Sequence, residues 1–258
     1  MKAKNFLMLL LLLFAGLQTT WAQKVVLHLT GNQAVEYDIS QLDSISFIEE
    51  TNEEITDTHE WVDLGLPSGT LWATCNVGAN SPEEYGDYFA WGETAPKSDY
   101  SLSTYKYCKG FYDTMTKYCT DSAWGTVDNK TELEPSDDAA TVNWGSVWQM
   151  PSYKQCRELI NSSYTTTTWT TMNGVTGRKI TSKSNGNSIF LPAAGYRYDT
   201  SLGGAGSYGL YWSRSLGTGD DSSTSNSAYY PLFDSGFIDT YSNSRYYGQS
   251  VRPVRVKK

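Results

Sequence analysis

Histidine is nearly absent from this sequence, and its scarcity argues against several kinds of active site. The 258 residues contain two histidines, His28 and His59, both in the first quarter of the chain. Nucleophilic schemes that pair serine or cysteine with a histidine base therefore lack their central residue in the remainder, as do histidine-rich zinc sites. We expect His28 to lie on a strand face and His59 to be solvated. We predict no catalytic residue, no metal site and no cofactor.

Cysteine is also scarce, and its spacing argues against metal binding. The four cysteines, Cys75, Cys108, Cys119 and Cys156, include no C-x-x-C pair, so neither a thiolate zinc site nor a thioredoxin-like motif is expected. In an exported protein an even number of cysteines is compatible with disulfides, and Cys108 with Cys119 would be the most local bridge. The alternative is that all four are small, buried apolar side chains.

Long apolar runs are missing after the N-terminus, so we predict no transmembrane segment. The N-terminus itself has the pattern of an export signal: Lys2 and Lys4 precede a short apolar run at 6–15, and small residues follow at the cleavage positions. We predict a signal peptide over residues 1–22 and a mature chain that begins at Gln23. The protein would then reach the periplasm, the cell surface or the exterior.

Positive charge is in the minority, with 20 Lys and Arg against 28 Asp and Glu and a formal net charge of −8. An acidic protein repels phosphate backbones, so nucleic acid is not an expected partner. Many of the acidic residues gather at 49–59. Because like charges repel and extend a chain, we predict a solvated linker there rather than a tail that binds a metal or a partner.

This linker would separate a small β segment, residues 23–48, from one larger domain, residues 60–258. In the small segment, strand-forming runs at 24–29 and 34–39 flank a Gly-Asn turn, and 45–47 could add a third strand. In the larger domain, short β-branched and aromatic runs alternate with Gly, Asn, Asp and Pro. The clearest predicted strands there are 179–181, 189–191 and 228–230.

One segment, residues 151–160, predicts a helix. Ser152 can cap its first turn together with Gln155, and Cys156 and Leu159 share one face. Elsewhere helices are not indicated, and the 9 Trp and 19 Tyr would hold the long irregular connections by aromatic packing. The fold class expected from these patterns is α+β, with far more loop and strand than helix.

Two motifs that could indicate chemistry are weak on inspection. Residues 204–209 fit the dinucleotide-binding pattern G-x-G-x-x-G, but the next residues predict a strand rather than the required helix, so we interpret them as a turn. Acidic pairs occur at 83–84, 137–138 and 220–221. Adjacent strand residues point to opposite faces, so none is a glycosidase dyad by itself. The pair at 137–138 could bind Ca²⁺, or all three pairs could be solvated loop acids.

A polar, tyrosine-rich segment occupies residues 213–244. Tyr, Ser, Gly and Asn also dominate antibody paratopes, where tyrosine supplies rigid contact area and the small polar residues supply adaptable hydrogen bonds. Planar rings also suit the faces of sugars. This composition indicates a binding surface. The alternative is a set of ordinary polar loops whose tyrosines cover the core.

Several strings resemble one known family, the Fibrobacter succinogenes major paralogous domain. They cover about residues 60–256 in the family's order, with Gln149 where the family usually has a basic residue. The strings are WVDLGLPSGTLWATCNVG (61–78), YGDYFAWGE (85–93), WQMPS (148–152), IFLPAAGYR (189–197), LYWS (210–213) and GQSVRPV (248–254). The resemblance implies an exported protein of Bacteroidetes or their relatives.

That domain is in turn similar to the C-type-lectin-like fold of formylglycine-generating-enzyme relatives and of retroelement-diversified ligand-binding proteins. The enzymes use two cysteines near the C-terminal end, whereas no cysteine follows Cys156 here, so the resemblance implies that this activity is absent. In the binding proteins the variable surface lies between a Tyr-Trp strand and the closing strand. The corresponding residues here are 213–249.

We therefore predict an exported, non-catalytic binding or adhesion module on a C-type-lectin-like α+β scaffold, with a glycan or a surface protein as its ligand. Alternatives are a carbohydrate-active hydrolase that uses two distant carboxylates and a structural subunit of the envelope or of fimbriae. Alanine at Tyr241 or Tyr246 should abolish binding and leave the melting temperature nearly unchanged. The expected contact residues are Tyr230, Tyr241, Asn243, Tyr246 and Tyr247; the expected scaffold residues are Phe190, Leu191, Trp212 and Val251, with Arg252 as a structural cation.

Overall fold

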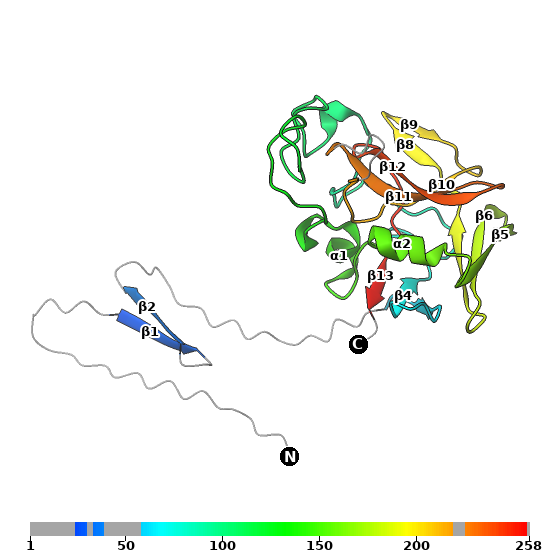
Figure 1. Cartoon of the computed structure of the whole chain (residues 1–258), viewed down its shortest axis with the longest axis horizontal. Coiled ribbons are helices and arrows are strands. Elements are labelled where there is room, and N and C mark those ends of the chain that lie inside the picture. The colour runs from blue at the N-terminus through cyan, green and yellow to red at the C-terminus, as the bar shows by residue number, and fades with distance from the viewer. Residues whose placement is uncertain (1–23, 30–32, 39–57, 219–224, 257–258) are drawn as a thin grey trace, which may run out of the picture. The chain divides into compact units, whose positions relative to one another are not determined.

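Thirteen strands and two short α-helices make up the regular structure of the described residues, and Figure 1 traces them from blue to red. In this computed structural model the described residues are 24–29, 33–38, 58–218 and 225–256. The chain divides into two compact units, Met1–Glu53 and Glu54–Lys258. Among the described residues, no helix combines the length and the apolar character needed to cross a membrane.

The expected α+β class is wrong, because strands far outnumber helices in the described part of the chain. The α-helices are α1 (Ala139–Trp144) and α2 (Tyr153–Leu159), and two 3-10 turns, η2 (Leu102–Thr104) and η3 (Pro135–Asp137), precede them in the chain. All named strand pairs are antiparallel and belong to small sheets of two or three strands. The apolar runs are too short, and too rich in β-branched and aromatic residues, to form longer helices. The fold class is therefore corrected from α+β to mostly β.

The described residues of the first unit form a hairpin. Its strands β1 (Lys24–Leu29) and β2 (Gln33–Asp38) pair with Lys24 opposite Asp38, and the Lys24 ammonium lies 2.9 Å from the Glu36 carboxylate. Both strands were predicted from the sequence and are confirmed. The predicted signal peptide at 1–22, the third strand at 45–47, nearly all of the acidic linker and the side chain of His28 lie outside the described residues.

In the second unit the first and last strands share one sheet, in the order β13-β4-β3. The central strand is fully buried, and its two neighbours pair with it antiparallel. The first and the last strand of the unit therefore flank the same central strand. The members are β3 (Trp61–Asp63), β4 (Thr70–Ala73) and β13 (Val254–Val256).

Two further three-stranded sheets and one hairpin complete the unit, with orders β5-β6-β7, β10-β11-β12 and β8-β9. The strands predicted at 179–181, 189–191 and 228–230 lie within β6, β7 and β11 and are confirmed. The bounds are β5 (Thr165–Met172), β6 (Val175–Ser182), β7 (Ser188–Pro192), β8 (Tyr196–Tyr198), β9 (Ser201–Gly203), β10 (Gly209–Leu210), β11 (Ser227–Phe233) and β12 (Ile238–Ser244).

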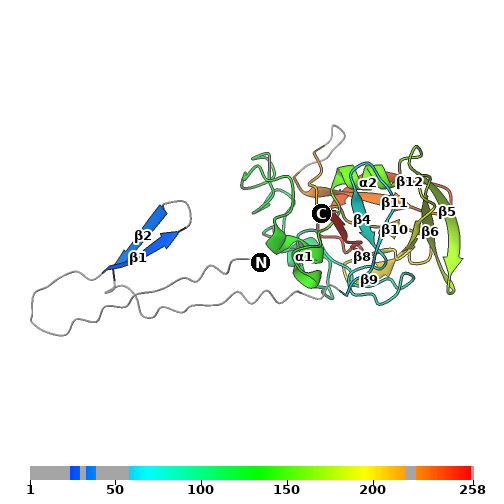
Figure 2. The same ribbon diagram turned by 90° about the horizontal axis from the view of Figure 1, so that it is seen from below.

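Helix α2 forms as its local sequence predicts. The Ser152 hydroxyl accepts a hydrogen bond from the backbone N–H of Gln155, and the Gln155 side chain accepts one from the Ser152 N–H, which completes a capping box. Cys156 and Leu159 are buried on its inner face. This face packs against β11 and β12, beside which Figure 2 shows the helix.

The G-x-G-x-x-G segment is a turn between β9 and β10, as predicted, and no helix follows it. The Tyr208 N–H donates to the Gly204 carbonyl at 2.9 Å, and the backbone of Gly204 and Gly206 has positive φ angles of 67° and 79°. Without a helix N-terminus the segment lacks the dipole that holds a pyrophosphate.

The predicted scaffold residues Phe190, Leu191, Trp212 and Val251 are all at most 2 % exposed, which confirms their role. Arg252 is confirmed as a structural cation of the closing segment. Its guanidinium donates to the Asn76 amide oxygen and to the carbonyls of residues 73 and 74 at 2.8–3.1 Å.

The structure excludes one of the two alternatives left open for the cysteines and corrects the expectation for His59. All four cysteines are free thiols, so no Cys108–Cys119 bridge forms; the two sulfurs lie 3.1 Å from the carbonyls of Leu102 and Asp121, respectively. His59 is half-buried rather than solvated, because its ring stacks on Trp144 with the centroids 3.8 Å apart.

Candidate ligand-binding groove

A groove of about 400 Å³ opens between four strands of the larger unit. We call it the tyrosine groove. Residues of β8, β10, β11 and β12 line it, together with two from connecting segments, and none of the described lining residues is charged. The lining residues are Tyr196, Tyr208, Leu210, Tyr230, Leu232, Asn243 and Tyr247.

Strand pairing explains why several predicted contact residues meet here. Tyr230 on β11 lies directly opposite Tyr241 on β12, and Asn243 follows two residues later on the same face of β12. The polar, tyrosine-rich segment, for which polar loops were the alternative to a binding surface, thus contains a β-hairpin. Tyr229, the neighbour of Tyr230, points to the other face and stacks on Tyr153 with the centroids 4.1 Å apart.

The structure brings three of the five predicted contact residues into the groove lining: Tyr230, Asn243 and Tyr247. Tyr241 lies beside them, 46 % exposed, with its ring centroid 6.5 Å from that of Tyr230. Tyr246 differs, because it is 6 % exposed and its hydroxyl lies 3.1 Å from that of Tyr112. The expectation that alanine at Tyr246 would leave the stability unchanged is therefore corrected, since this ring is part of the core.

The rings around the groove support one another. The Tyr247 ring has Tyr246, Tyr198 and Tyr196 as neighbours, with centroids 4.9, 5.0 and 5.9 Å away. Tyr230 packs edge-on against the fully buried Trp212 at 5.8 Å. Rings held in this way lose little conformational freedom when a ligand binds.

Burial also fixes the charge state of the phenols. It raises the pKa of Tyr230 to about 12, and it raises the pKa of Tyr247 and of Tyr246 as well. These phenols are therefore neutral near pH 7 and can both donate and accept a hydrogen bond. The surface they form is aromatic and uncharged.

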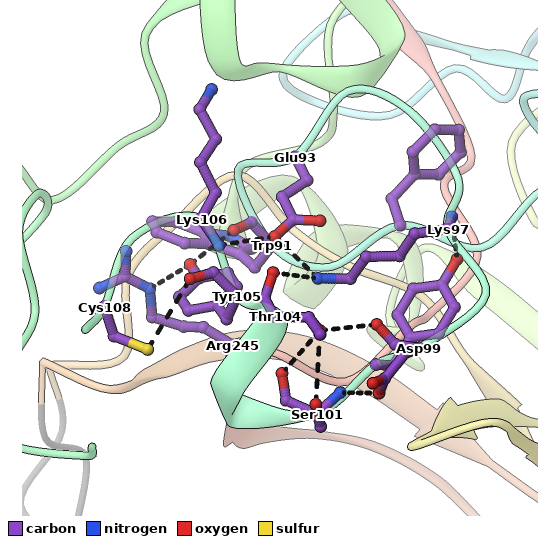
Figure 3. Close-up of polar contacts among 12 residues, drawn as sticks. Trp91, Glu93, Lys97, Asp99, Ser101, Thr104, Tyr105, Lys106, Cys108 and Arg245 are labelled. Atoms are coloured by element: carbon purple, nitrogen blue, oxygen red, sulfur yellow. Dashed lines mark hydrogen bonds and ion pairs between the residues drawn. The ribbon is translucent and has the colours of Figure 1, made fainter. Parts of the chain in front are cut away.

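A buried arginine anchors the segment that carries Tyr246 and Tyr247. Arg245 is 0 % exposed, and its Nε donates to the Tyr105 hydroxyl at 2.8 Å. Its Nη atoms donate to the carbonyls of Lys117, Tyr118 and Ser225 at 3.0, 3.2 and 2.7 Å. The guanidinium also stacks over Trp91, 4.8 Å from the ring centroid, and Figure 3 shows it beside Trp91 and Tyr105. This one cation thus ties the long connection before α1 to the end of β12.

The acidic pair 137–138 has structural partners, so neither the calcium site nor the solvated loop describes it. The Asp137 carboxylate accepts from the Tyr118 hydroxyl at 2.7 Å and pairs with the Lys117 and Lys106 ammonium groups. Asp138 caps α1 by accepting from the backbone N–H of Thr141. The pair 220–221 lies outside the described residues. Within the described ranges, no three His, Cys, Asp or Glu side chains lie close enough to hold a metal ion.

Sequence reasoning missed the half of the groove contributed by residues 196–210. Tyr196 and Tyr208 lie outside the segment that was singled out for its composition. A signal was present, since Tyr196 and Tyr198 alternate with Arg197, the pattern of a strand with one aromatic face. The sequence could not show that this strand and β11 would line the same groove.

The comparisons with known proteins bear on this C-terminal part. Residues 155–254 match a domain of unknown function, DUF8237. The match runs from α2 into β13 and includes all seven lining residues of the tyrosine groove, but it covers less than half of the chain. Searches of curated proteins and of solved structures found no match. The functional argument therefore rests on the geometry of the groove.

Proposed function

We propose that this chain is an exported, non-catalytic binding module that holds a neutral saccharide in the tyrosine groove. The observation that carries the proposal is a groove of about 400 Å³ lined by four tyrosines, two leucines and one asparagine. Small-molecule sites typically have volumes of roughly 300–1,000 Å³ and aromatic walls with a few placed polar groups. Export, and the resemblance to the Fibrobacter domain, stay predictions in this proposal.

The chemistry of the lining residues favours a sugar over other small ligands. Aromatic faces pack against the C–H face of a pyranose, while neutral phenols and the Asn243 amide can donate to and accept from its hydroxyl groups. No lining side chain carries a charge that an ionic ligand would need.

The same lining argues against hydrolysis at this site. A glycosidase needs two carboxyl groups roughly 5–10 Å apart across the scissile bond. None of the seven lining residues is acidic, and Asp137 and Asp138 already have protein partners. A binding module needs no such pair, so binding is the function that the groove supports best.

A titration of the full chain with a panel of neutral mono- and disaccharides, followed by tyrosine and tryptophan fluorescence, tests the proposal. Tyr247→Ala should weaken binding about tenfold or more, because it removes a stacking wall worth about 1.5 kcal/mol. Asn243→Ala should also weaken it and leaves every ring in place. The matched control is Tyr164→Ala, an exposed tyrosine that lines a different pocket.

The proposal fails if no saccharide of the panel binds, or if Tyr247→Ala and Asn243→Ala bind as tightly as the unmodified chain. Thermal unfolding of each variant separates lost contacts from lost folding. Asn243→Ala is the decisive variant if Tyr247→Ala unfolds.

A further inference from the structure

Arg197 points away from the tyrosine groove into a second, larger one. It lies between Tyr196 and Tyr198 on β8, whose rings contact Tyr247, so strand alternation places its side chain on the opposite face. There its guanidinium carbon lies 5.2 Å from the centroid of the Tyr88 ring. Reciprocal backbone hydrogen bonds with Gly248, at 2.7 and 2.9 Å, hold this part of β8 in place.

The Arg197 guanidinium is half-buried, yet it has no acceptor among the residues that the structure describes. No side-chain hydrogen bond from it, and no carboxylate within ion-pair distance, is present there. Arg245 and Arg252, by contrast, each donate at least three hydrogen bonds to protein groups. Burial raises the pKa of Tyr88 to about 12, so the ring beneath Arg197 is a neutral phenol and not a counter-ion. An arginine fork placed on an aromatic ring is well suited to a planar anion.

The groove in front of Arg197 has a volume of about 710 Å³, and we call it the Arg197 groove. Two other charged residues line it, Lys97 and Asp87. The Lys97 ammonium is already used: it pairs with the Glu93 carboxylate at 2.9 Å and donates to the Thr104 carbonyl at 3.1 Å, as Figure 3 shows. Of the two cationic side chains that line the groove, Arg197 is therefore the one that can pair with a ligand.

The remaining lining residues indicate what else the ligand carries. The Tyr88 and Tyr100 hydroxyls donate inward, to the carbonyls of Ala194 at 2.5 Å and of Tyr88 at 2.6 Å, so both hydroxyls are occupied by the protein. Asp87 offers a carboxylate that can accept hydrogen bonds from hydroxyl groups but would repel a second anionic group. A ligand with one anion and several hydroxyls meets both conditions. A polyanion does not, and the net charge of −8 opposes it further.

We propose that the Arg197 groove is a second binding site, which takes an acidic sugar: the sugar carboxylate pairs with the Arg197 fork and its hydroxyls donate to Asp87. This site goes beyond the proposed function, because it shares no lining residue with the tyrosine groove. Uronic acids and sialic acids both present this chemistry, and the experiment distinguishes them.

Calorimetric titration of the full chain with D-galacturonate, N-acetylneuraminate, D-galactose and the methyl ester of D-galacturonate tests the site. At least one of the two acids should bind, with a dissociation constant of about 1 mM or below. Galactose and the uncharged ester should bind at least about tenfold more weakly, because they lack the charge-assisted pair. Binding of the acid should also weaken as salt is added.

Variants assign the binding to Arg197. Arg197→Met keeps the apolar stem over Tyr88 and removes the fork, and it should lower the affinity for the acid about tenfold or more. Arg197→Lys keeps the charge without the fork and should restore part of the affinity, which also keeps the test informative if the methionine variant unfolds. The control is Arg157→Met, an exposed arginine beside Asp239. The two grooves share no lining residue, so this site and the tyrosine groove fail or succeed separately.

Three results would overturn the proposal: neither acid binds, galactose or the ester binds as tightly as the acid, or Arg197→Met binds the acid like the unmodified chain. Equal loss of acid binding in Arg157→Met would also overturn it, since the effect would then follow net charge and not the groove.

Discussion

Replacing Arg245 with methionine should strongly destabilise the larger unit, because the side chain is fully buried and saturated with hydrogen bonds. The substitution keeps an apolar stem of similar length and removes all the donors. Three backbone carbonyls then lose this donor, whereas the Tyr105 hydroxyl keeps its hydrogen bond to the Trp91 carbonyl. Each buried group left without a partner costs about 1–3 kcal/mol.

The magnitude follows from these contacts and one opposing effect. Three orphaned carbonyls at the low end of that range, about 1 kcal/mol each, give about 3 kcal/mol. Losing the stacking over Trp91 adds to this cost. Removing a buried charge that has no carboxylate partner among the described residues lowers the cost by a similar amount. The net loss of about 3 kcal/mol is a large share of the 5–15 kcal/mol that typically separates the folded from the unfolded state.

Thermal unfolding followed by near-ultraviolet circular dichroism, which reports on the packed aromatic side chains, measures this loss. For a domain of this size about 1 kcal/mol shifts the melting temperature by roughly 2–4 °C, so Arg245→Met should melt about 6–12 °C lower. Arg157→Met is the control: this arginine is exposed and 3.3 Å from Asp239, and its loss should cost no more than about 0.5 kcal/mol. If both variants melt alike, the desolvation of the Arg245 charge cancels its hydrogen bonds and the reasoning is wrong.

Two further predictions concern stability. Gly248→Ala should lower the melting temperature and weaken binding of the acidic sugar. The added Cβ would lie 2.6 Å from the Tyr100 ring and 3.0 Å from the Arg197 Cβ, so both side chains would have to move. An unchanged melting temperature and unchanged binding would contradict this close packing. Burial by itself raises the pKa of Asp137, but hydrogen bonds from Lys117 and Tyr118 outweigh this effect and lower the pKa to about 2. The ionised carboxylate therefore stabilises the fold above pH 4, and this stabilisation is lost as the pH falls through about 2. Asp137→Asn should therefore be less stable than the unmodified chain in urea at pH 7, and the difference should shrink between pH 4 and pH 2; a constant difference over that range would refute the assigned role.

Predictions from the sequence succeeded where the deciding contacts are local. The capping box of α2 lies within four residues, and the hairpin β1–β2 depends on two alternating runs around a turn. In these two cases the physical cause is close to the residues in the chain. Arg252 differs, because its acceptors are residues 73, 74 and 76; its role could still be predicted, since an arginine is rarely buried without partners.

The errors share a different cause, which is packing between distant segments. Tyr246 was expected at the surface, but Tyr112, more than a hundred residues earlier, covers it. Asp137 was expected to be solvated or to bind a metal, but its carboxylate pairs with the Lys117 ammonium and accepts a hydrogen bond from the Tyr118 hydroxyl. The α+β class was wrong because the regular structure between the long connections proved to be short antiparallel sheets and not helices. Composition singled out tyrosines on β11 and β12 but could not show that β8 would line the same groove.

The pairing of β13 with β4 also determines when this unit can fold. β4 is the central strand of its sheet, and its partner on one side is made only when residues 254–256 have been synthesised. Until then one edge of an apolar strand has no neighbour, and such an edge can pair with other chains. Contacts that span nearly the whole unit also make folding slow, because a long loop must close first. The unit should thus fold only once residues 254–256 have been synthesised, and removing these residues should leave an aggregation-prone chain instead of a slightly shortened domain.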